Sequence, residues 1–108
     1  MQRGEIYVVD FPKAGKHVQF GKRPAIIVSN NVNNRCSPVV IVVPCTGMRK
    51  KTSLPTHVLM CNELRLPSVV LCEQITTVPI DALVDYCGKC GPKTMKNVDE
   101  ALKISLGL

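Results

Sequence analysis

The sequence has no tryptophan, and its aromatic residues make up 4% of 108 residues. So few aromatic residues do not support extensive stacking of nucleic-acid bases on aromatic side chains. No segment approaches the roughly 18 consecutive apolar residues of a membrane span. The N-terminus also lacks an apolar run of signal-peptide length. We therefore expect a cytoplasmic protein with no membrane partner, whose thiols are mostly reduced.

The sequence also lacks internal repeats and low-complexity tracts, and its length fits one domain, residues 1–108. Hydrophobic residues make up 45% of it, which is too many for a disordered tail. A chain of this size forms one modest core, and self-association would protect more apolar surface. Lys and Arg number 14 against 8 acidic residues, a formal net charge of +6. That excess favours polyanionic partners, although solvated surface charge is an equally good explanation.

Short apolar runs separated by turn residues predict about five strands followed by one helix. From Pro92 onward, apolar residues recur at helical spacing on one face and charged residues fall largely on the other. Pro79 to Leu83 predicts a helical turn, and Asn30 to Pro38 a turn region. This pattern indicates a mainly β protein with helices (α+β), built on a strongly curved sheet or small barrel. The expected strands are Gly4–Phe11, Pro24–Ser29, Val39–Pro44, His57–Cys61 and Val69–Thr77.

Two polar residues stand where buried strands meet loops. Arg23 lies where a long loop, Pro12–Lys22, enters an apolar strand, and Thr46 lies where another strand runs into the basic loop Gly47–Pro55. Residues where a strand meets a loop commonly take part in ligand binding. Taken as bare residues, they are more simply explained as a surface cation and a turn-starting hydroxyl.

Five stretches resemble the MazF/PemK family of toxins. The strings Gly-Lys-Arg-Pro-Ala-Ile-Ile-Val-Ser-Asn at 21–30 and Val-Val-Pro-Cys-Thr at 42–46 resemble two family signatures. Further similarity lies in Leu-Pro-Thr-His-Val at 54–58, Val-Leu-Cys-Glu-Gln-Ile at 70–75 and Val-Asp-Glu-Ala-Leu at 98–102. Each string alone is weak, but their order and spacing agree along nearly the whole chain.

The resemblance implies an SH3-like small barrel of CcdB/PemK type, with a C-terminal amphipathic helix, that works as a homodimer. It implies a sequence-specific endoribonuclease that cuts single-stranded RNA, usually messenger RNA, and leaves a 2′,3′-cyclic phosphate and a 5′-hydroxyl. It also implies a cognate antitoxin with an acidic, disordered C-terminal segment. The catalytic arginine and threonine of the family fall on Arg23 and Thr46. Two alternatives remain: a non-catalytic poison of a protein such as DNA gyrase, as in the related CcdB branch, and a plain SH3-like binding module.

These residue types suit that chemistry. A guanidinium matches two phosphate oxygens with paired donors, and a hydroxyl such as that of Thr46 can hold another oxygen. Because the attacking 2′-OH belongs to the substrate, no metal or cofactor is required, and RNA is selected over DNA. We also expect RNA contacts from residues around the two signatures and in the basic loop. These substrate-binding candidates are His17, Gln19, Phe20, Lys22, Arg49, Lys50, Gln74 and Thr77.

The sequence departs from the family pattern at two positions. Many members have Ser-Glu-Gln in the first loop, whereas this chain has His17-Val18-Gln19, so the acid is missing. His17 could replace it as an acid–base group, or be an ordinary solvated histidine. Thr76 stands where relatives often have an arginine. Glu73 and Gln74 remain, either in contact with RNA or bonded to loop backbone.

Two further features have no assigned role in this scheme. Cys87 and Cys90 form a C-x-x-C, but no second pair of ligands accompanies them, so we expect incidental thiols rather than zinc. His57 begins a strand and is expected to be structural. The RNA recognition sequence and the identity of the antitoxin are not encoded in any pattern of the chain.

Overall fold

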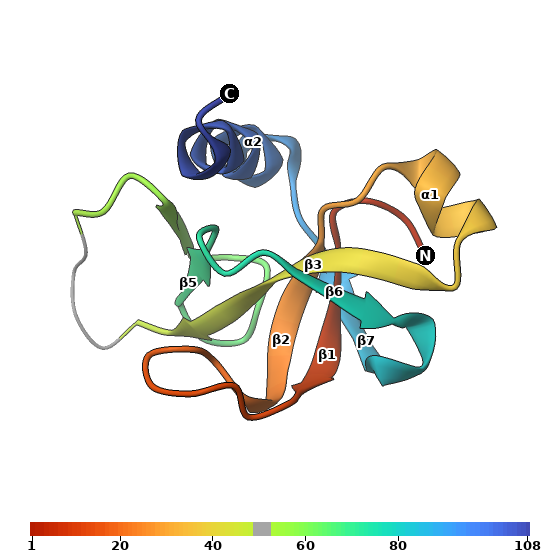
Figure 1. Ribbon diagram of the computed structural model, residues 1–108. Coiled ribbons are helices and arrows are strands. Elements are labelled where there is room, and N and C mark those ends of the chain that lie inside the picture. Colours follow the sequence, from red (N-terminus) through yellow and green to blue (C-terminus); the bar gives the residue numbers. More distant parts are fainter. Residues whose placement is uncertain (49–52) are drawn as a thin grey trace.

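The computed structural model describes residues 1–48 and 53–108 and contains one antiparallel sheet with two α-helices. Figure 1 shows the sheet curving strongly, with helix α2 above one end and α1 at the other. Neither helix in the described part of the chain has the length and apolar character to cross a membrane. The elements are β1 Glu5–Phe11, β2 Gly21–Ile27, α1 Asn31–Cys36, β3 Val39–Gly47, β4 His57–Met60, β5 Ser68–Leu71, β6 Thr76–Pro79, the 3₁₀ turn Ile80–Ala82, β7 Leu83–Lys89 and α2 Pro92–Leu106.

The pairing order of the sheet is β4-β5-β3-β2-β1-β7, with β6 also paired to β3. The mainly β class with a terminal helix is confirmed. Among the described residues, however, β4 and β7 end the pairing order, so the small barrel is not closed. Two buried clusters fill the two faces of the sheet. One, which includes Ile26, Val43 and Val98, lies under α2, and the other, which includes Ala25, Val42 and Val78, lies on the opposite face.

Strand β3 is shared by three partners, and this sharing determines where the site forms. Its first half pairs with β6, its centre with β2, and its last three residues with β5. The final pair between β2 and β3 is Ala25 with Pro44. Beyond that pair β2 continues beside β1 while β3 turns away to β5, as Figure 1 shows. The two strands therefore part at the end where Arg23 and Thr46 lie.

One expected strand is in fact two. Val69–Thr77 is interrupted by a turn between β5 and β6. From Cys45 to Val42, three residues back along β3, the partner moves six residues, from Val70 to Thr76. Three residues are therefore extra on the partner side and bulge out of the ladder. The interruption frees Glu73 and Gln74 from strand pairing.

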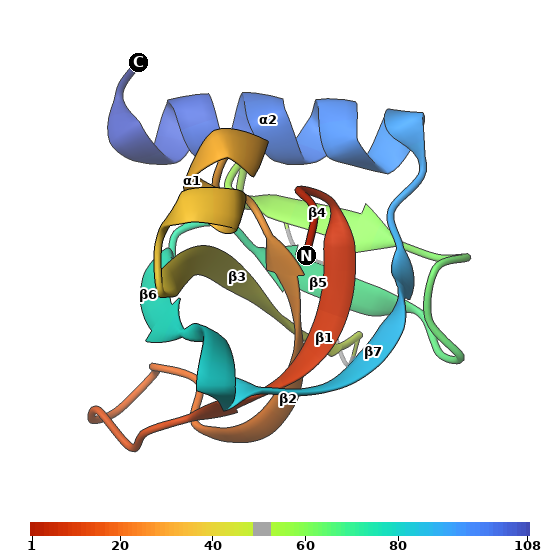
Figure 2. The same ribbon diagram turned by 90° about the vertical axis from the view of Figure 1, so that its right-hand side faces the viewer.

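Helix α2 follows its sequence signals, whereas α1 lies within the expected turn region Asn30–Pro38 and β7 was not expected. Pro92 occupies the first turn of α2, and Gly107, at φ 71°, ends it. Val98 and Ala101 are the buried residues of α2. The helix packs against β4, the strand that lies beneath it in Figure 2. Helix α1 is capped by the side chain of Asn30, which accepts a hydrogen bond from the backbone of Asn33.

Candidate nucleic-acid interface

Arg23 lies in β2, paired with Val9 of β1, and its side chain is partly buried. Its Nε donates a hydrogen bond to the carbonyl oxygen of Phe20, at 2.9 Å. A guanidinium has five N–H donors, so this bond fixes the side chain and leaves the terminal amino groups for a ligand. The bond also ties the guanidinium to the end of the first loop.

Thr46 is the penultimate residue of β3, pairs with Val69, and is partly buried. Ala25 and Pro44 are directly opposite each other, and Arg23 and Thr46 each lie two residues further along their strands. Side chains two residues apart on a strand project from the same face. Arg23 and Thr46 therefore project from one face of the sheet, at the point where β2 and β3 part.

The side-chain amide of Gln74 holds the first loop against this region. Its oxygen accepts a hydrogen bond from the backbone N–H of Gln19 at 2.9 Å, and its Nε2 donates to the carbonyl oxygen of His17 at 3.1 Å. Of the two roles left open for Gln74, bonding to loop backbone is the one present in the structure. The interruption between β5 and β6 makes this contact possible, because residue 74 is outside the ladder.

The first loop carries three of the expected contact residues. His17 is exposed and adopts a left-handed backbone conformation, with φ 64°. The side chain of Phe20 is 48% exposed, and Lys13 Nζ lies 5.7 Å from the centre of its ring. Gln19 is partly buried, and its Oε1 is buried with no hydrogen-bond partner among the described residues. A buried acceptor without a donor is a good position for a ligand N–H.

Other expected contact residues lie elsewhere. Lys22 is exposed, but adjacent side chains on a strand face opposite ways, so it projects away from the Arg23 face. Thr77 pairs with Ile41, five residues before Thr46 on β3 and on the alternate face, so it is not brought to the pair. Arg49 and Lys50 lie outside the described residues.

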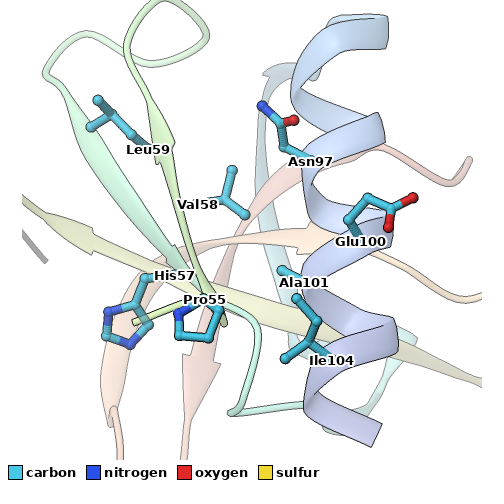
Figure 3. Close-up of a pocket in the computed structure, with 8 residues that line it drawn as sticks. All are labelled: Pro55, His57, Val58, Leu59, Asn97, Glu100, Ala101 and Ile104. Carbon is cyan, nitrogen blue, oxygen red and sulfur yellow. The ribbon is translucent and has the colours of Figure 1, made fainter. Parts of the chain in front are cut away.

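His57 is bonded to Glu73, with 2.7 Å between Nε2 and the carboxylate oxygen. This pair links the start of β4 to the interruption after β5. The neighbouring pocket, of about 280 Å³, lies between β4 and α2. Figure 3 shows His57, Pro55 and Leu59 on its β4 side and Asn97, Glu100 and Ile104 on its helix side. None of its lining residues belongs to β2 or β3, so it is a surface separate from Arg23 and Thr46.

The thiols lie in different surroundings. All six are free; Cys87 is exposed, whereas Cys90 is buried and lies 3.9 Å from the sulfur of Met60. The described residues contain no group of three or more His, Cys, Asp or Glu side chains arranged to hold a metal ion. Burial raises the pKa of the Cys90 thiol to about 12, which makes it a poor nucleophile.

The chain is thus an α+β protein with a curved antiparallel sheet, and a guanidinium and a hydroxyl lie together where two of its strands part. Comparison with known proteins identifies the family. Residues 2–106 match the family model described as PemK-like, MazF-like toxin of type II toxin–antitoxin system. The chain belongs to this family, which confirms the resemblance. It is 39% identical, over 100% of its length and 92% of the relative, to a protein named Endoribonuclease MazF from Staphylococcus saprophyticus subsp. saprophyticus.

Solved structures agree with this assignment. One, titled as an endoribonuclease in complex with its cognate antitoxin from a mycobacterial species, has a TM-score of 0.84 and 34% identity, covering 100% of this chain and 96% of that one. MazF from Deinococcus radiodurans has a TM-score of 0.85 at 20% identity, covering 100% and 97%, and supports the fold alone. The fold is thus that of solved MazF toxins.

Proposed function

We propose that this chain is an endoribonuclease toxin that cuts single-stranded RNA without a metal ion. The observation that carries the proposal is that Arg23 and Thr46 project from one face at the parting of β2 and β3. Membership of a toxin family and 39% identity to a protein named Endoribonuclease MazF support the enzyme class. Messenger RNA is the substrate that the family resemblance implies.

The reaction is an internal transfer within the substrate. The ribose 2′-oxygen loses its proton and bonds to the adjacent phosphorus, and the bond from phosphorus to the 5′-oxygen breaks. The leaving oxygen takes up a proton, which gives a 2′,3′-cyclic phosphate and a 5′-hydroxyl. Negative charge grows on the non-bridging oxygens in the transition state, and fixed donors aimed at them are commonly the largest catalytic contribution.

Arg23 and Thr46 supply those donors. The terminal amino groups of Arg23 bind the phosphate while its Nε stays bonded to Phe20, so the guanidinium is already oriented when RNA arrives. The hydroxyl of Thr46 donates to a phosphate oxygen from the facing strand. Because Val18 replaces the acid of many relatives, we assign proton acceptance from the 2′-OH to His17, which is exposed in the same loop.

The first loop and Gln74 form the wall of the RNA site. Gln19 Oε1, buried without a donor, accepts from a base N–H, and Phe20 stacks on a base. The cognate antitoxin covers the same site with an acidic segment, which a formal net charge of +6 favours. The chain acts as a homodimer, which size-exclusion chromatography with light scattering tests directly.

One assay separates this function from its alternatives. Purified protein is incubated with a long single-stranded RNA in excess EDTA, beside Arg23→Ala, Thr46→Ala and the surface control Arg35→Ala. We expect defined cuts by the wild type and by Arg35→Ala, and none by the other two. Absence of cuts by the wild type would contradict the proposal, and binding to DNA gyrase in that case would point to the CcdB-like alternative.

A further inference from the structure

A second hollow, of about 320 Å³, lies beside the parting of β2 and β3. Its walls come from β2, β3, β5 and the connector between β4 and β5, residues 61–67. In Figure 2 this connector projects at the right of the sheet, whereas the first loop projects at the lower left. We call the hollow the rim pocket; it is lined by Pro24, Gly47, Leu64, Arg65, Leu66 and Ser68.

The walls of the rim pocket are tied in place. Ser68 Oγ donates a hydrogen bond to the carbonyl oxygen of Leu66 at 3.1 Å, and Met48 N donates to the carbonyl oxygen of Pro67 at 3.3 Å. Leu64 packs against the buried cluster under α2. Leu66, in contrast, is 70% exposed. The pocket is thus a formed apolar hollow with one large aliphatic side chain left in water.

One cation, Arg65, lines this hollow, and a second, Lys22, lies nearby on β2. Arg65 is exposed and makes no ion pair or hydrogen bond with any described residue. Lys22 is also exposed and lies two residues before Pro24 on β2, hence on the same face of the strand. An apolar hollow with unpaired positive charge beside it fits a ligand that is flat and apolar on one part and anionic on another. A nucleotide has that combination.

The position of the rim pocket relates it to the proposed cut. Pro24 follows Arg23 directly, and Gly47 follows Thr46 directly. Adjacent residues on a strand face opposite ways, so the rim pocket lies on the opposite face of the sheet from the side chains of Arg23 and Thr46. A nucleotide in the rim pocket is therefore not the one that carries the cleaved phosphate. It lies at least one nucleotide further along the same RNA strand.

We propose that the rim pocket is a distal nucleotide subsite, in which one unpaired RNA base lies against Leu66 and Pro24 and its phosphate is bound by Arg65. This inference rests on the proposed function and extends it to a named part of the substrate. A volume of about 320 Å³ is at the low end for ligand sites, which suits one base rather than a longer segment. The subsite contributes affinity and choice of sequence, not chemistry.

The test begins with the cut mapped on a long RNA. A short RNA around the cut is then made with a 2′-deoxy sugar at the attacking position, so that it binds but is not cleaved. Single abasic positions are introduced one at a time, and affinities are measured by fluorescence anisotropy at several salt concentrations. The proteins are wild type, Arg65→Ala, Leu66→Ala and the matched control Arg35→Ala. A fifth, Gly47→Leu, adds a bulky side chain to the pocket wall, where a Cβ meets no described atom within 4 Å.

We expect one abasic position, at least one nucleotide from the cut, to weaken wild-type binding about tenfold. Leu66→Ala and Gly47→Leu should bind intact RNA with a similar loss and lose nothing more at that abasic position. Arg65→Ala should lower the slope of log affinity against log salt by about 0.7, and Leu66→Ala should leave that slope unchanged. Arg35→Ala should behave as wild type throughout.

Three results overturn the inference. If wild type cuts RNA but the rim-pocket variants bind every RNA as Arg35→Ala does, no base occupies the pocket. If these variants lose affinity for an acidic antitoxin peptide and not for RNA, the surface belongs to the protein partner. If wild type makes no cut at all, the proposed function itself fails and the subsite falls with it.

Discussion

Gln74 and Gln19 are joined by a hydrogen bond of 2.9 Å that spans 55 residues of sequence, from the side-chain oxygen of one to the backbone N–H of the other. The same side chain also donates to the carbonyl oxygen of His17. The Gln74 amide thus holds the first loop at two points, next to Phe20, whose carbonyl oxygen accepts the hydrogen bond from Arg23. Gln74 therefore supports the position of the Arg23 guanidinium although it belongs to neither β2 nor β3.

Replacing Gln74 with alanine should loosen the first loop without unfolding the sheet. Two partly exposed hydrogen bonds are lost, so the free energy of unfolding should fall by about 1 kcal/mol. The value of kcat/KM for RNA should fall roughly tenfold, because the loop no longer fixes Phe20 and Arg23. Hydrogen exchange of residues 17–20 should rise in Gln74→Ala and not in the surface control Gln2→Ala. Unchanged exchange would show that the loop is held by other contacts.

Exchange of Arg23 for lysine keeps the charge and removes the paired planar donors. If the guanidinium binds two phosphate oxygens, Arg23→Lys should lose about 10²-fold or more in kcat. Thr46→Ser keeps the hydroxyl and should retain most activity, whereas the near-isosteric Thr46→Val should lose it. Single-turnover cleavage measures all three. Equal activity of Thr46→Ser and Thr46→Val would exclude a role for the hydroxyl.

The assignment of His17 as proton acceptor makes a prediction about pH. Asparagine tolerates the left-handed conformation found at this position but does not titrate, so His17→Asn keeps the backbone and removes the base. An imidazole accepts a proton only in its neutral form. The cleavage rate of His17→Asn should be lower than that of the wild type and should depend less on pH. An identical profile for both proteins would place the base elsewhere.

Buried thiols should make the fold sensitive to alkali. Burial raises the pKa of Cys72 to about 12 from an ordinary 9.0, with the Glu73 carboxylate adding to it, and raises that of Cys45 further still. Folding therefore favours the protonated thiol, so its stabilisation is complete below about pH 9 and is lost as the pH rises toward 12. Urea unfolding between pH 7 and 10.5 should show a falling free energy, and a shallower fall in Cys45→Ala than in the exposed control Cys36→Ala.

Much of the fold was predictable because its signals are local. The alternation in Gly4–Phe11, the apolar runs of β2 and β3, and the helical spacing after Pro92 each correspond to an element of the structure. Strand β7 was missed because Val84 and Tyr86 are exposed and two register shifts interrupt its pairing with β1. The break inside Val69–Thr77 was missed because residues 72–75, Cys-Glu-Gln-Ile, contain no glycine or proline to mark a turn.

The site was predictable in part, and for a different reason. Arg23 and Thr46 stood out at strand mouths, but only the register of β2 and β3 shows that they share a face. The two hydrogen bonds from the Gln74 side chain to the first loop depend on the direction in which the bulge points that side chain. The rim pocket was not foreseen, since residues 62–68 only separate two of the strands expected from the sequence. An arginine between two leucines was the signal available there.

The three residues that bulge between β5 and β6 also restrict how the length of this chain can vary. Removing one residue there would put β6 out of phase with β3, turning Val78 outward and Thr77 inward. It would also withdraw the amide that holds the first loop. Insertions and deletions among relatives should therefore avoid residues 72–75 and gather in the first loop and the 61–67 connector. These two segments are the ones proposed to contact RNA. Changes in their length can therefore alter which RNA sequence is cut without altering the sheet.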